Sequence, residues 1–585
     1  MRFNIALKFR HSYPQPAKPD FQENRSLARG WRQIALLSGL LVLGACSSNP
    51  LDKINLETLN PFKEAEKDEG QRGSIGFVRG FLGGVAVDEP RAALIGRDIL
   101  SSGGSAADVA VAVALTLAVT KPASASLGGG GVCLVHDALS NTTETLDFQA
   151  GIPKTIAPGA VRPSAIPGTL RGLALLHAKY GRLEWNQLVS PAEKLARFGN
   201  PVSRATASDL ARLPRAVLDD PEFRRIFTNP KNGRLIGEGD FLKQQDLSAI
   251  LSRIRARGAG DFYGGLLGQK FASAANTVGG GFTLDELRRY APRWRATLKV
   301  PYLKNTNFHF PATAGPSGVL AAQMMAMMIK RGDWENASSL QRSHLMAEIS
   351  ARAYSFSGQW LRDDGGKSIQ VSYLLSDEMV ARLLSGFQKN RHTAPAQGGQ
   401  GATPPVTGTG TSFVAVDREG SAVACGLTLN NLFGTGRIVP DTGILLSALP
   451  GPRGRGPDSV SVMMLVNTLH NIFFYAGAAS GGTVSPSAMV QVASRTMMAR
   501  DGESLVQAIN ARRVHGGGNG QTHYEQGLED AVVERLTTQG HRLSPVPGLG
   551  LVNAVFCTSG VPNKKGLSCL QRSDPRGFGL SSGAQ

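Results

Sequence analysis

The spacing of the five cysteines shows most directly which chemistry the chain can support, because metal sites, redox motifs and disulfides each require a characteristic spacing. No two of them form a CxxC pair, which excludes a zinc ribbon and a thioredoxin-type redox motif. Cys557 and Cys569 flank the turn-forming segment TSGVPNKKGLS, so a hairpin could join them as a disulfide or leave two buried thiols. Cys133 and Cys425 lie in apolar, strand-like runs and are predicted to be unpaired core residues, and His470 is likewise predicted to lie in the core. The histidines and acidic residues show no metal-ligand spacing, so no metal and no other cofactor is expected.

The fifth cysteine, Cys46, follows an apolar run near the start of the chain. Residues 34–45 read IALLSGLLVLGA, a run too short to span a bilayer, and arginines precede it in residues 25–32. This order of positive flank, apolar run, small residues and cysteine is typical of a bacterial lipoprotein signal peptide. Ser47 matches the pattern that sorts lipoproteins to the outer membrane. We therefore expect residues 1–45 to be removed and the protein to be lipid-anchored through Cys46, facing the periplasm in the cell envelope.

Composition indicates a folded, globular protein. Of the 585 residues, 42% are hydrophobic and 18% are charged, which argues against extensive disorder. The net charge of +18 favours an anionic surface or solute as a neighbour. The basic residues form no long cluster, so nucleic-acid binding is not expected.

Changes in local composition divide the remaining chain. Residues 46–75 are polar and charged and are predicted to form a tether. Residues 92–119 read as two helices broken at a glycine pair, the second of them buried on all sides. A long helical middle leads to residues 392–410, which are crowded with glycine, proline and threonine and are predicted to be a flexible linker. Strand patterns begin at Ser412, so helices dominate the first part and strands the last.

A series of motifs resembles the gamma-glutamyltranspeptidase family of N-terminal-nucleophile (Ntn) hydrolases, and the resemblance extends from about residue 76 to residue 577. In chain order the motifs are ILSSGGSAADVAVAVALTLAVTKPASASLGGGG (99–131), TLDFQAGIP, AIPGTLRGLALLHAKYGRL, PATAGPSGVLAAQM, SFVAVDREGSAVACGLTLNNLFGTGRIVPDTGILL (412–446), ASGGT (479–483) and SDPRG (573–577). The resemblance implies an α+β fold, a four-layer αββα sandwich with a large helical N-terminal part and a strand-rich C-terminal part. It also implies a large-subunit-like region, 76–410, and a small-subunit-like region, 411–585.

The family's chemistry uses a threonine that self-cleavage exposes as a new N-terminus. Its hydroxyl is the nucleophile and its own amine is the base, because a threonine hydroxyl attacks an amide poorly without a nearby proton acceptor. Paired backbone N–H groups stabilise the oxyanion, and Gly481 and Gly482 match that pair. Thr428 matches the threonine that supports the nucleophile, and Asn430 matches a substrate-binding asparagine.

The nucleophile position departs from the family's pattern. When Asp417 is placed on the family's aspartate, Gly410 falls on the nucleophile and Thr411 on the following threonine. Cleavage is therefore expected between Gly410 and Thr411, with Thr411 as nucleophile, or Thr409 if the offset runs the other way. Either substitution requires a one-residue slip, which turns strand side chains to the opposite face.

The residues that hold glutamate in the family have also changed. The arginine that binds the α-carboxylate is Gln149 here, which removes a bidentate, charge-assisted contact. Pro452 replaces the acidic residue that receives the α-amino group, and Ser459 is the one serine retained from a pair. An amino-acid head group therefore meets few charged partners.

Two functions from different classes follow. The first is a self-cleaving amidohydrolase or acyltransferase acting on gamma-glutamyl or related small amides or peptides. The second is an uncleaved, catalytically inactive lipoprotein that keeps the fold for binding or scaffolding. A third, a lipoprotein of envelope transport, has only the basic charge to support it.

Overall fold

A computed structural model describes residues 82–584 except 157–159, 161, 314, 362–366, 396–408, 451–459, 500–502 and 563–568. All of these residues belong to one compact unit, Asp68–Gln585. The signal peptide, Cys46, the whole tether, most of the linker, Pro452 and Ser459 lie outside the described residues.

Two antiparallel sheets form the centre of this unit. The first has the strand order β20-β1-β9-β10-β2-β3-β6, and the second has the order β19-β18-β14-β13-β8-β7. The strands of the first sheet are β1 (Gly83–Val87), β2 (Gly130–Asp137), β3 (Thr142–Phe148), β6 (Arg293–Ala296), β9 (Thr411–Asp417), β10 (Ala422–Thr428) and β20 (Leu580–Ala584). Those of the second are β7 (Leu298–Leu303), β8 (Thr306–Phe310), β13 (Val460–Asn467), β14 (Ile472–Ser480), β18 (Leu551–Val561) and β19 (Cys569–Arg572).

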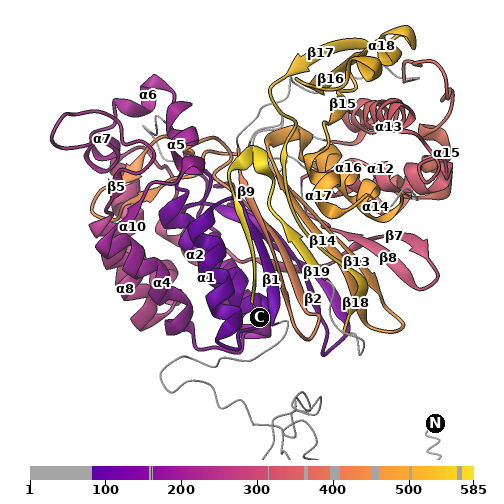
Figure 1. Ribbon diagram of the computed structural model, residues 1–585. Coiled ribbons are helices and arrows are strands. Elements are labelled where there is room, and N and C mark those ends of the chain that lie inside the picture. The colour runs from indigo at the N-terminus through magenta and orange to yellow at the C-terminus, as the bar shows by residue number, and fades with distance from the viewer. Residues whose placement is uncertain are drawn as a thin grey trace, which may run out of the picture. The chain divides into compact units, whose positions relative to one another are not determined.

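Helices cover the outer face of each sheet, giving the four layers αββα (Figure 1). On the first sheet lie α1 (Pro90–Ser101), α2 (Ala106–Thr120), α3 (Thr169–Tyr180), α4 (Trp185–Phe198), α8 (Gln245–Arg257), α9 (Gly260–Gly264), α10 (Leu266–Thr277) and α11 (Leu284–Arg289). On the second lie α12 (Ser317–Arg331), α13 (Ser339–Trp360), α14 (Val371–Leu374), α15 (Asp377–Leu383), α16 (Ser485–Met497) and α17 (Leu505–Asn510). This architecture confirms the fold class expected from the sequence.

Smaller elements surround these layers. A three-stranded sheet packs with α18 (Asp530–Thr538), and a separate apolar cluster gathers α5 (Arg204–Ala211), α6 (Arg215–Leu218) and α7 (Pro221–Phe227). The remaining strands are β4 (Asn200–Pro201), β5 (Phe241–Leu242), β11 (Ile438–Val439), β12 (Ile444–Leu445), β15 (Val514–Gly516), β16 (Gln521–Glu525) and β17 (Arg542–Val546).

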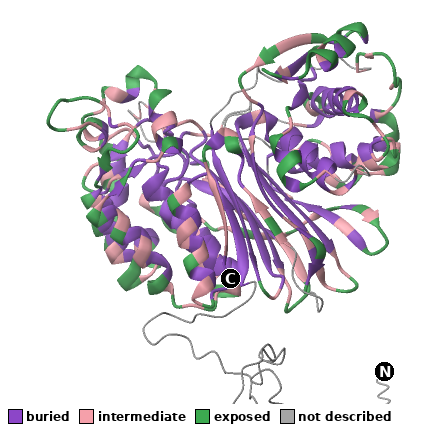
Figure 2. Ribbon diagram, viewed as in Figure 1, coloured by how far each residue is buried: buried purple, intermediate pink, exposed green. Residues whose placement is uncertain are grey.

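Burial follows the layers, because the sheets are apolar on both faces while the helices expose their outer sides (Figure 2). One apolar cluster lies between the first sheet and its helices, one between the two sheets, and one between the second sheet and its helices. All fifteen residues of α2 are buried, as its alanine- and valine-rich sequence predicts. Ser105 and Asp108 form a capping box that fixes its N-terminus.

Both sheets mix strands from either side of the Gly410–Thr411 junction. In the first sheet β9, which begins at Thr411, lies between β1 and β10, and the C-terminal strand β20 pairs with β1 (Figure 1). The second sheet likewise pairs β8 with β13. Cleavage at the junction would therefore leave two pieces that share both sheets.

Two disulfides cross-link neighbouring strands. Cys557 and Cys569 are bonded across β18 and β19. Cys133 and Cys425 are also bonded, because they are directly opposite one another on β2 and β10. The prediction that Cys133 and Cys425 are unpaired is therefore wrong, since a local pattern does not reveal which strands are neighbours. His470 was also predicted incorrectly, because it lies exposed in the turn between β13 and β14, where its N–H donates to Asn467.

Candidate active site

The junction predicted from the sequence lies at the start of β9. Thr411 is the first residue of the strand, is fully buried, and pairs in unbroken register with β10. Gly410 precedes it with a φ of 81°, a left-handed conformation that glycine adopts at little cost. The backbone at the family's nucleophile position is thus suited to glycine, and β9 carries no bulge in its pairing with β10.

The hydroxyl of Thr411 donates to a buried carboxylate. Thr411 Oγ1 lies 3.1 Å from Oδ2 of Asp88, the residue that directly follows β1. The same oxygen accepts the N–H of Ser412 at 2.8 Å, and the N–H of Asp88 donates to the Ser412 carbonyl at 3.4 Å. The register of β1 on β9, which sets Val87 opposite Phe413, brings Asp88 to this position.

Two side chains from the second sheet complete the surroundings of Asp88. Ser480, the last residue of β14, donates to Oδ2 at 3.2 Å, and Asn553 on β18 donates to Oδ1 at 2.7 Å. Burial raises the pKa of Asp88 above its usual value, although the charge of Lys121 and the hydrogen bonds from Asn553, Ser412 and Thr411 oppose the rise. Lys121 itself forms a buried ion pair with Asp209 at 2.7 Å. The carboxylate is therefore held by donors from both sheets.

The predicted oxyanion glycines lie directly after β14. The N–H of Gly481 donates to the carbonyl of Thr409 at 3.2 Å. Gly481 has a φ of 116°, and a Cβ there would lie 2.8 Å from the Cα of Gly550, so only glycine fits. Gly482, with a φ of 77°, begins a short 3₁₀ turn, Gly482–Val484, that leads into α16. The structure therefore places one predicted donor on the backbone of the junction, one residue before Gly410.

Thr409 carries the other candidate hydroxyl. The residue is 6% exposed, and its Oγ1 has no hydrogen-bond partner among the described residues. A buried hydroxyl without a partner is uncommon and costs stability. Thr409 therefore remains a candidate for the reactive hydroxyl, because its backbone also binds the predicted donor Gly481.

Thr428 and Asn430 build the turn after β10. The hydroxyl oxygen of Thr428 accepts the N–H of Asn430 at 2.9 Å, and both residues are buried. The side chain of Asn430 donates to the carbonyl of Ala448 at 2.7 Å, which fixes the segment that follows β12. The structure thus gives both residues a role in shaping the loop beside the junction.

Gln149 follows β3 and is half-buried. The hydrogen bonds that the structure shows for it are made by its backbone, including one from the Tyr290 hydroxyl to its carbonyl at 2.8 Å. Gly130 packs directly beneath this segment, because a Cβ there would lie 2.2 Å from the nitrogen of Ala150. The described contacts do not bring Gln149 to Thr411.

Asp88, Ser480 and Asn553 are site residues that sequence reasoning missed. Each lies at or within an apolar strand of ordinary appearance, and the three come from widely separated parts of the chain. The local signals are weak: Asp88 is an acidic residue directly after a strand, which is common at strand ends, and Ser480 lies in the ASGGT motif directly before Gly481. Their convergence depends on strand order and register.

A second cluster of titratable side chains lies in the other helical layer. His344 and Glu348, one turn apart on α13, meet His541, and their potential ligand atoms lie within 4.8 Å of one another. The Arg352 guanidinium lies 2.6 Å from Glu348, and His344 Nδ1 lies 2.8 Å from His541 Nε2. Burial lowers the pKa of His541 to about 3, so its imidazole stays neutral. A divalent cation would meet a carboxylate already neutralised by Arg352, so these residues do not fit a metal and form a hydrogen-bonded network instead.

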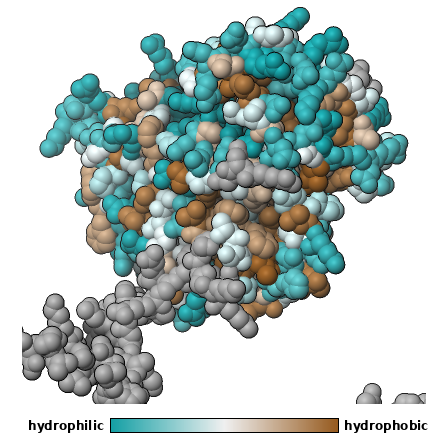
Figure 3. All heavy atoms as spheres, turned by 45° about the vertical axis from the view of Figure 1, so that its right-hand side comes forward, coloured by the Kyte–Doolittle hydropathy of each residue, from teal (hydrophilic) through white to brown (hydrophobic). Residues whose placement is uncertain are grey.

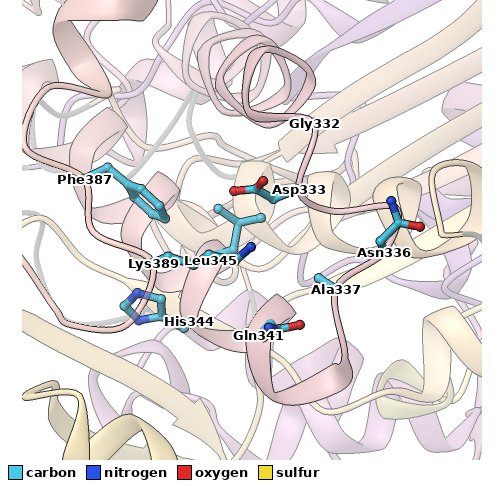
Figure 4. Close-up of a pocket in the computed structure, with 9 residues that line it drawn as sticks. All are labelled: Gly332, Asp333, Asn336, Ala337, Gln341, His344, Leu345, Phe387 and Lys389. Carbon is cyan, nitrogen blue, oxygen red and sulfur yellow. The ribbon is translucent and has the colours of Figure 1, made fainter.

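A cavity of about 240 Å³ opens beside this network (Figure 4). His344, Leu345, Phe387 and Lys389 border it, together with residues of the connection from α12 to α13. Asp88, Thr411 and Gly481 are not among its lining residues, so this cavity does not serve the junction.

On the face seen in Figure 3, apolar side chains are interspersed with polar ones, so this face offers no second candidate for a functional site. Strongly exposed apolar residues such as Leu139, Phe198 and Leu303 come from separate elements. Single exposed apolar side chains of this kind are normal in soluble domains.

Comparison with known proteins agrees with this arrangement. Residues 92–584 match the family described as Gamma-glutamyltranspeptidase. The glutathione hydrolase proenzyme of Escherichia coli (strain K12) is 27% identical over 525 residues, covering 82% of this chain and 89% of that protein. Scoloptoxin SSD14 of Scolopendra dehaani is 26% identical over 547 residues, covering 86% and 92%.

Among solved structures, a cephalosporin acylase from Bacillus halodurans superposes with a TM-score of 0.73 at 22% identity, covering 89% of this chain and 99% of that one. At this identity the likeness concerns the fold. The sequence match, in contrast, covers both sides of the junction and every strand of both sheets except β1. The chain therefore belongs to the gamma-glutamyltranspeptidase family, and this membership supports an amidohydrolase- or transferase-like function on gamma-glutamyl compounds.

Proposed function

We propose that this protein is an Ntn amidohydrolase or acyltransferase of the bacterial cell envelope that acts on gamma-glutamyl or related small amides or peptides after self-cleavage. The observation that carries the proposal is the hydrogen bond from the Gly481 N–H to the Thr409 carbonyl at 3.2 Å. It sets a predicted oxyanion donor on the backbone of the junction, at the carbonyl one residue before Gly410.

Thr411 is the proposed nucleophile, with cleavage between Gly410 and Thr411. Its hydroxyl is hydrogen-bonded at 3.1 Å to a carboxylate, which favours removal of its proton. After cleavage its amine becomes the base within the same residue. Gly481 and Gly482 supply the oxyanion donors, and Thr428 with Asn430 shapes the adjoining loop.

The substrate is proposed to differ from that of relatives named glutathione hydrolase. With Gln149 in place of an arginine, the α-carboxylate of a glutamyl group loses its bidentate cationic partner. We expect slow turnover of a γ-glutamyl anilide and a preference for acyl groups with less charge.

The envelope location rests on Cys46 and is supported by the two disulfides. Disulfides persist in oxidising compartments such as the periplasm and are rare in the cytosol. The proposed attachment is lipid on Cys46, which follows from the signal-peptide pattern of residues 34–46. Among the described residues no helix is long and apolar enough to cross a membrane.

Reducing denaturing electrophoresis of the purified mature protein tests the proposal. Cleavage before Thr411 predicts fragments of about 39 and about 19 kDa from residues 46–410 and 411–585. Reduction is essential, because the Cys133–Cys425 disulfide joins the two fragments. Thr411→Ala should abolish both fragments, whereas the neighbouring Thr409→Ala should retain them. Fragments that persist in Thr411→Ala and vanish in Thr409→Ala would transfer the nucleophile to Thr409.

A second candidate is an uncleaved, non-catalytic lipoprotein that uses the fold for binding or scaffolding. It is favoured by Gly410, because the residue that follows the carbonyl bound by Gly481 carries no side chain. A single reduced band of about 57 kDa from folded protein would support this candidate and reject the enzyme.

A further inference from the structure

We propose that Asp88 is the general base that takes the proton from the Thr411 hydroxyl during self-cleavage. This inference rests on the proposed function and adds a catalytic residue to it. It answers a question that the family's chemistry leaves open for this chain, namely which group accepts the proton before any free amine exists.

The precursor needs a base outside Thr411. Before cleavage the nitrogen of Thr411 belongs to the Gly410–Thr411 peptide bond, and an amide nitrogen is not basic. The amine that acts as the base in the mature enzyme therefore cannot act as the base during self-cleavage. A carboxylate that already accepts the hydroxyl proton as a hydrogen bond meets the geometric requirement for a general base.

Asp88 meets this requirement through its Oδ2 atom, 3.1 Å from Thr411 Oγ1. The carboxylate is 1% exposed and held from both sheets, by the Ser412 N–H of the first and by Ser480 and Asn553 of the second. With the Thr411 hydroxyl, four donors from the three strands β9, β14 and β18 fix its orientation, so little reorganisation is needed when the proton moves.

The electrostatics of the site suit a base rather than an inert anion. Burial raises the pKa of Asp88, which increases its affinity for a proton, while Lys121 at the end of α2 opposes complete neutralisation. Lys121 is already paired with Asp209, and the neighbouring Glu89 is engaged in capping α1 through the Ala92 N–H. These charged groups leave Asp88 as the carboxylate directed at Thr411.

The step balances as an acyl shift followed by hydrolysis. Asp88 Oδ2 takes the proton as Thr411 Oγ1 bonds to the carbonyl carbon of Gly410. The Gly410–Thr411 C–N bond then breaks, and the proton passes from Asp88 to the departing nitrogen of Thr411. Water hydrolyses the resulting ester, which leaves a Gly410 carboxylate, a free Thr411 hydroxyl and the new N-terminal amine.

The test follows the rate of cleavage of freshly refolded precursor against pH, on reducing gels. Asp88→Asn should slow cleavage by about 100-fold or more and remove the rise of the rate with pH. Ser573→Ala is the matched control, because its hydroxyl bonds the Val87 carbonyl beside Asp88 at 3.0 Å without contacting the carboxylate. We expect this control to keep the wild-type pH profile.

A second variant separates catalysis from packing. Thr411→Cys supplies a thiol, which is a stronger nucleophile than a hydroxyl and loses its proton more readily. Its cleavage should therefore depend less on Asp88, and Asp88→Asn combined with Thr411→Cys should cleave nearly as fast as Thr411→Cys alone. Folded Asp88→Asn that cleaves at the wild-type rate with the wild-type profile would overturn the inference and leave the proposed function standing. Wild-type protein that never cleaves would overturn both. If Asp88→Asn fails to fold, the pH dependence of the wild-type cleavage rate decides. The rate should rise with pH through a single titration whose pKa lies above the ordinary aspartate range, and the absence of such a titration contradicts the role of Asp88.

Discussion

The Cys133–Cys425 disulfide should be the stronger of the two cross-links in the uncleaved chain. A disulfide stabilises a protein largely by restricting the unfolded chain, and the effect grows with the logarithm of the loop that it closes. Cys133 and Cys425 are separated by 292 residues, and Cys557 and Cys569 by 12. The loop-entropy relation then assigns about 6 kcal/mol to the long loop and about 3 kcal/mol to the short one.

The assay compares two paired substitutions in a Thr411→Ala background, which the proposed function expects to remain uncleaved. Cys133→Ala with Cys425→Ala should lower the free energy of unfolding in urea by about 3 kcal/mol more than Cys557→Ala with Cys569→Ala. Each pair removes two sulfur atoms, so the difference between the pairs mainly reports loop length. Equal losses in both pairs would refute the loop argument. Four thiols that react in the denatured, unreduced chain, Cys46 aside, would refute both disulfides.

The same cross-link predicts the behaviour of cleaved protein. Because Cys133 precedes the junction and Cys425 follows it, unreduced wild type should run as one band although its backbone is cut. Cys133→Ala with Cys425→Ala should release both fragments without reductant. A single band from this variant that separates only on reduction would show that another bond joins the pieces.

Three further substitutions test separate parts of the structure. Gly481→Ala should lower the free energy of unfolding in urea by at least about 1–2 kcal/mol and stop cleavage, because φ is 116° and the new Cβ would lie 2.8 Å from Gly550; full stability in this variant would contradict the geometry. Burial raises the pKa of Asp417 to about 7, so the native state binds a proton more tightly than the unfolded state, and stability should fall by up to about 4 kcal/mol as pH rises from 4 to 7. Asp417→Asn should lack this part of the decline, and parallel pH curves for the two proteins would count against it. Gln149→Arg should lower the KM for a γ-glutamyl anilide by about tenfold, and an unchanged KM would mean that this position lies outside the acyl pocket.

The sequence predicted the layers well because their signals are local. Short stretches of sequence were enough to predict three features. These are the break between α1 and α2 at the glycine pair, the complete burial of α2, and the turn between β9 and β10. The motif order supplied the αββα architecture, which no local periodicity could have provided. The pairing of Cys133 with Cys425 was missed because it depends on β2 and β10 being neighbours across nearly 300 residues.

The site shows the same division between local and long-range information. Thr411, Gly481 and Thr428 could be found from their motifs, and the structure places all three around the start of β9 or the adjoining turns. Asp88 could not be found from the sequence, because its role depends on the pairing of β1 with β9. That pairing ends at Val87 opposite Phe413 and so brings Asp88, the next residue, to the start of β9. Neither could the carbonyl that Gly481 holds, which is that of Thr409 rather than Gly410.

The hydrogen bond from Gly481 to the Thr409 carbonyl bears on the glycine at position 410. This chain has lost the hydroxyl at position 410, but it keeps a hydroxyl one residue later, on Thr411. In a strand, moving the reactive hydroxyl from one residue to the next turns it to the opposite face. Ser412 Oγ, on one face, reaches the Ala478 carbonyl of the second sheet at 3.2 Å, whereas Thr411 Oγ1 reaches Asp88. A hydroxyl displaced in this way leaves the surroundings of the original nucleophile, and in this chain it meets the Asp88 carboxylate. Cleavage in this chain therefore depends on whether Asp88 compensates for the displacement, and the Asp88→Asn and Thr411→Cys variants measure that dependence directly.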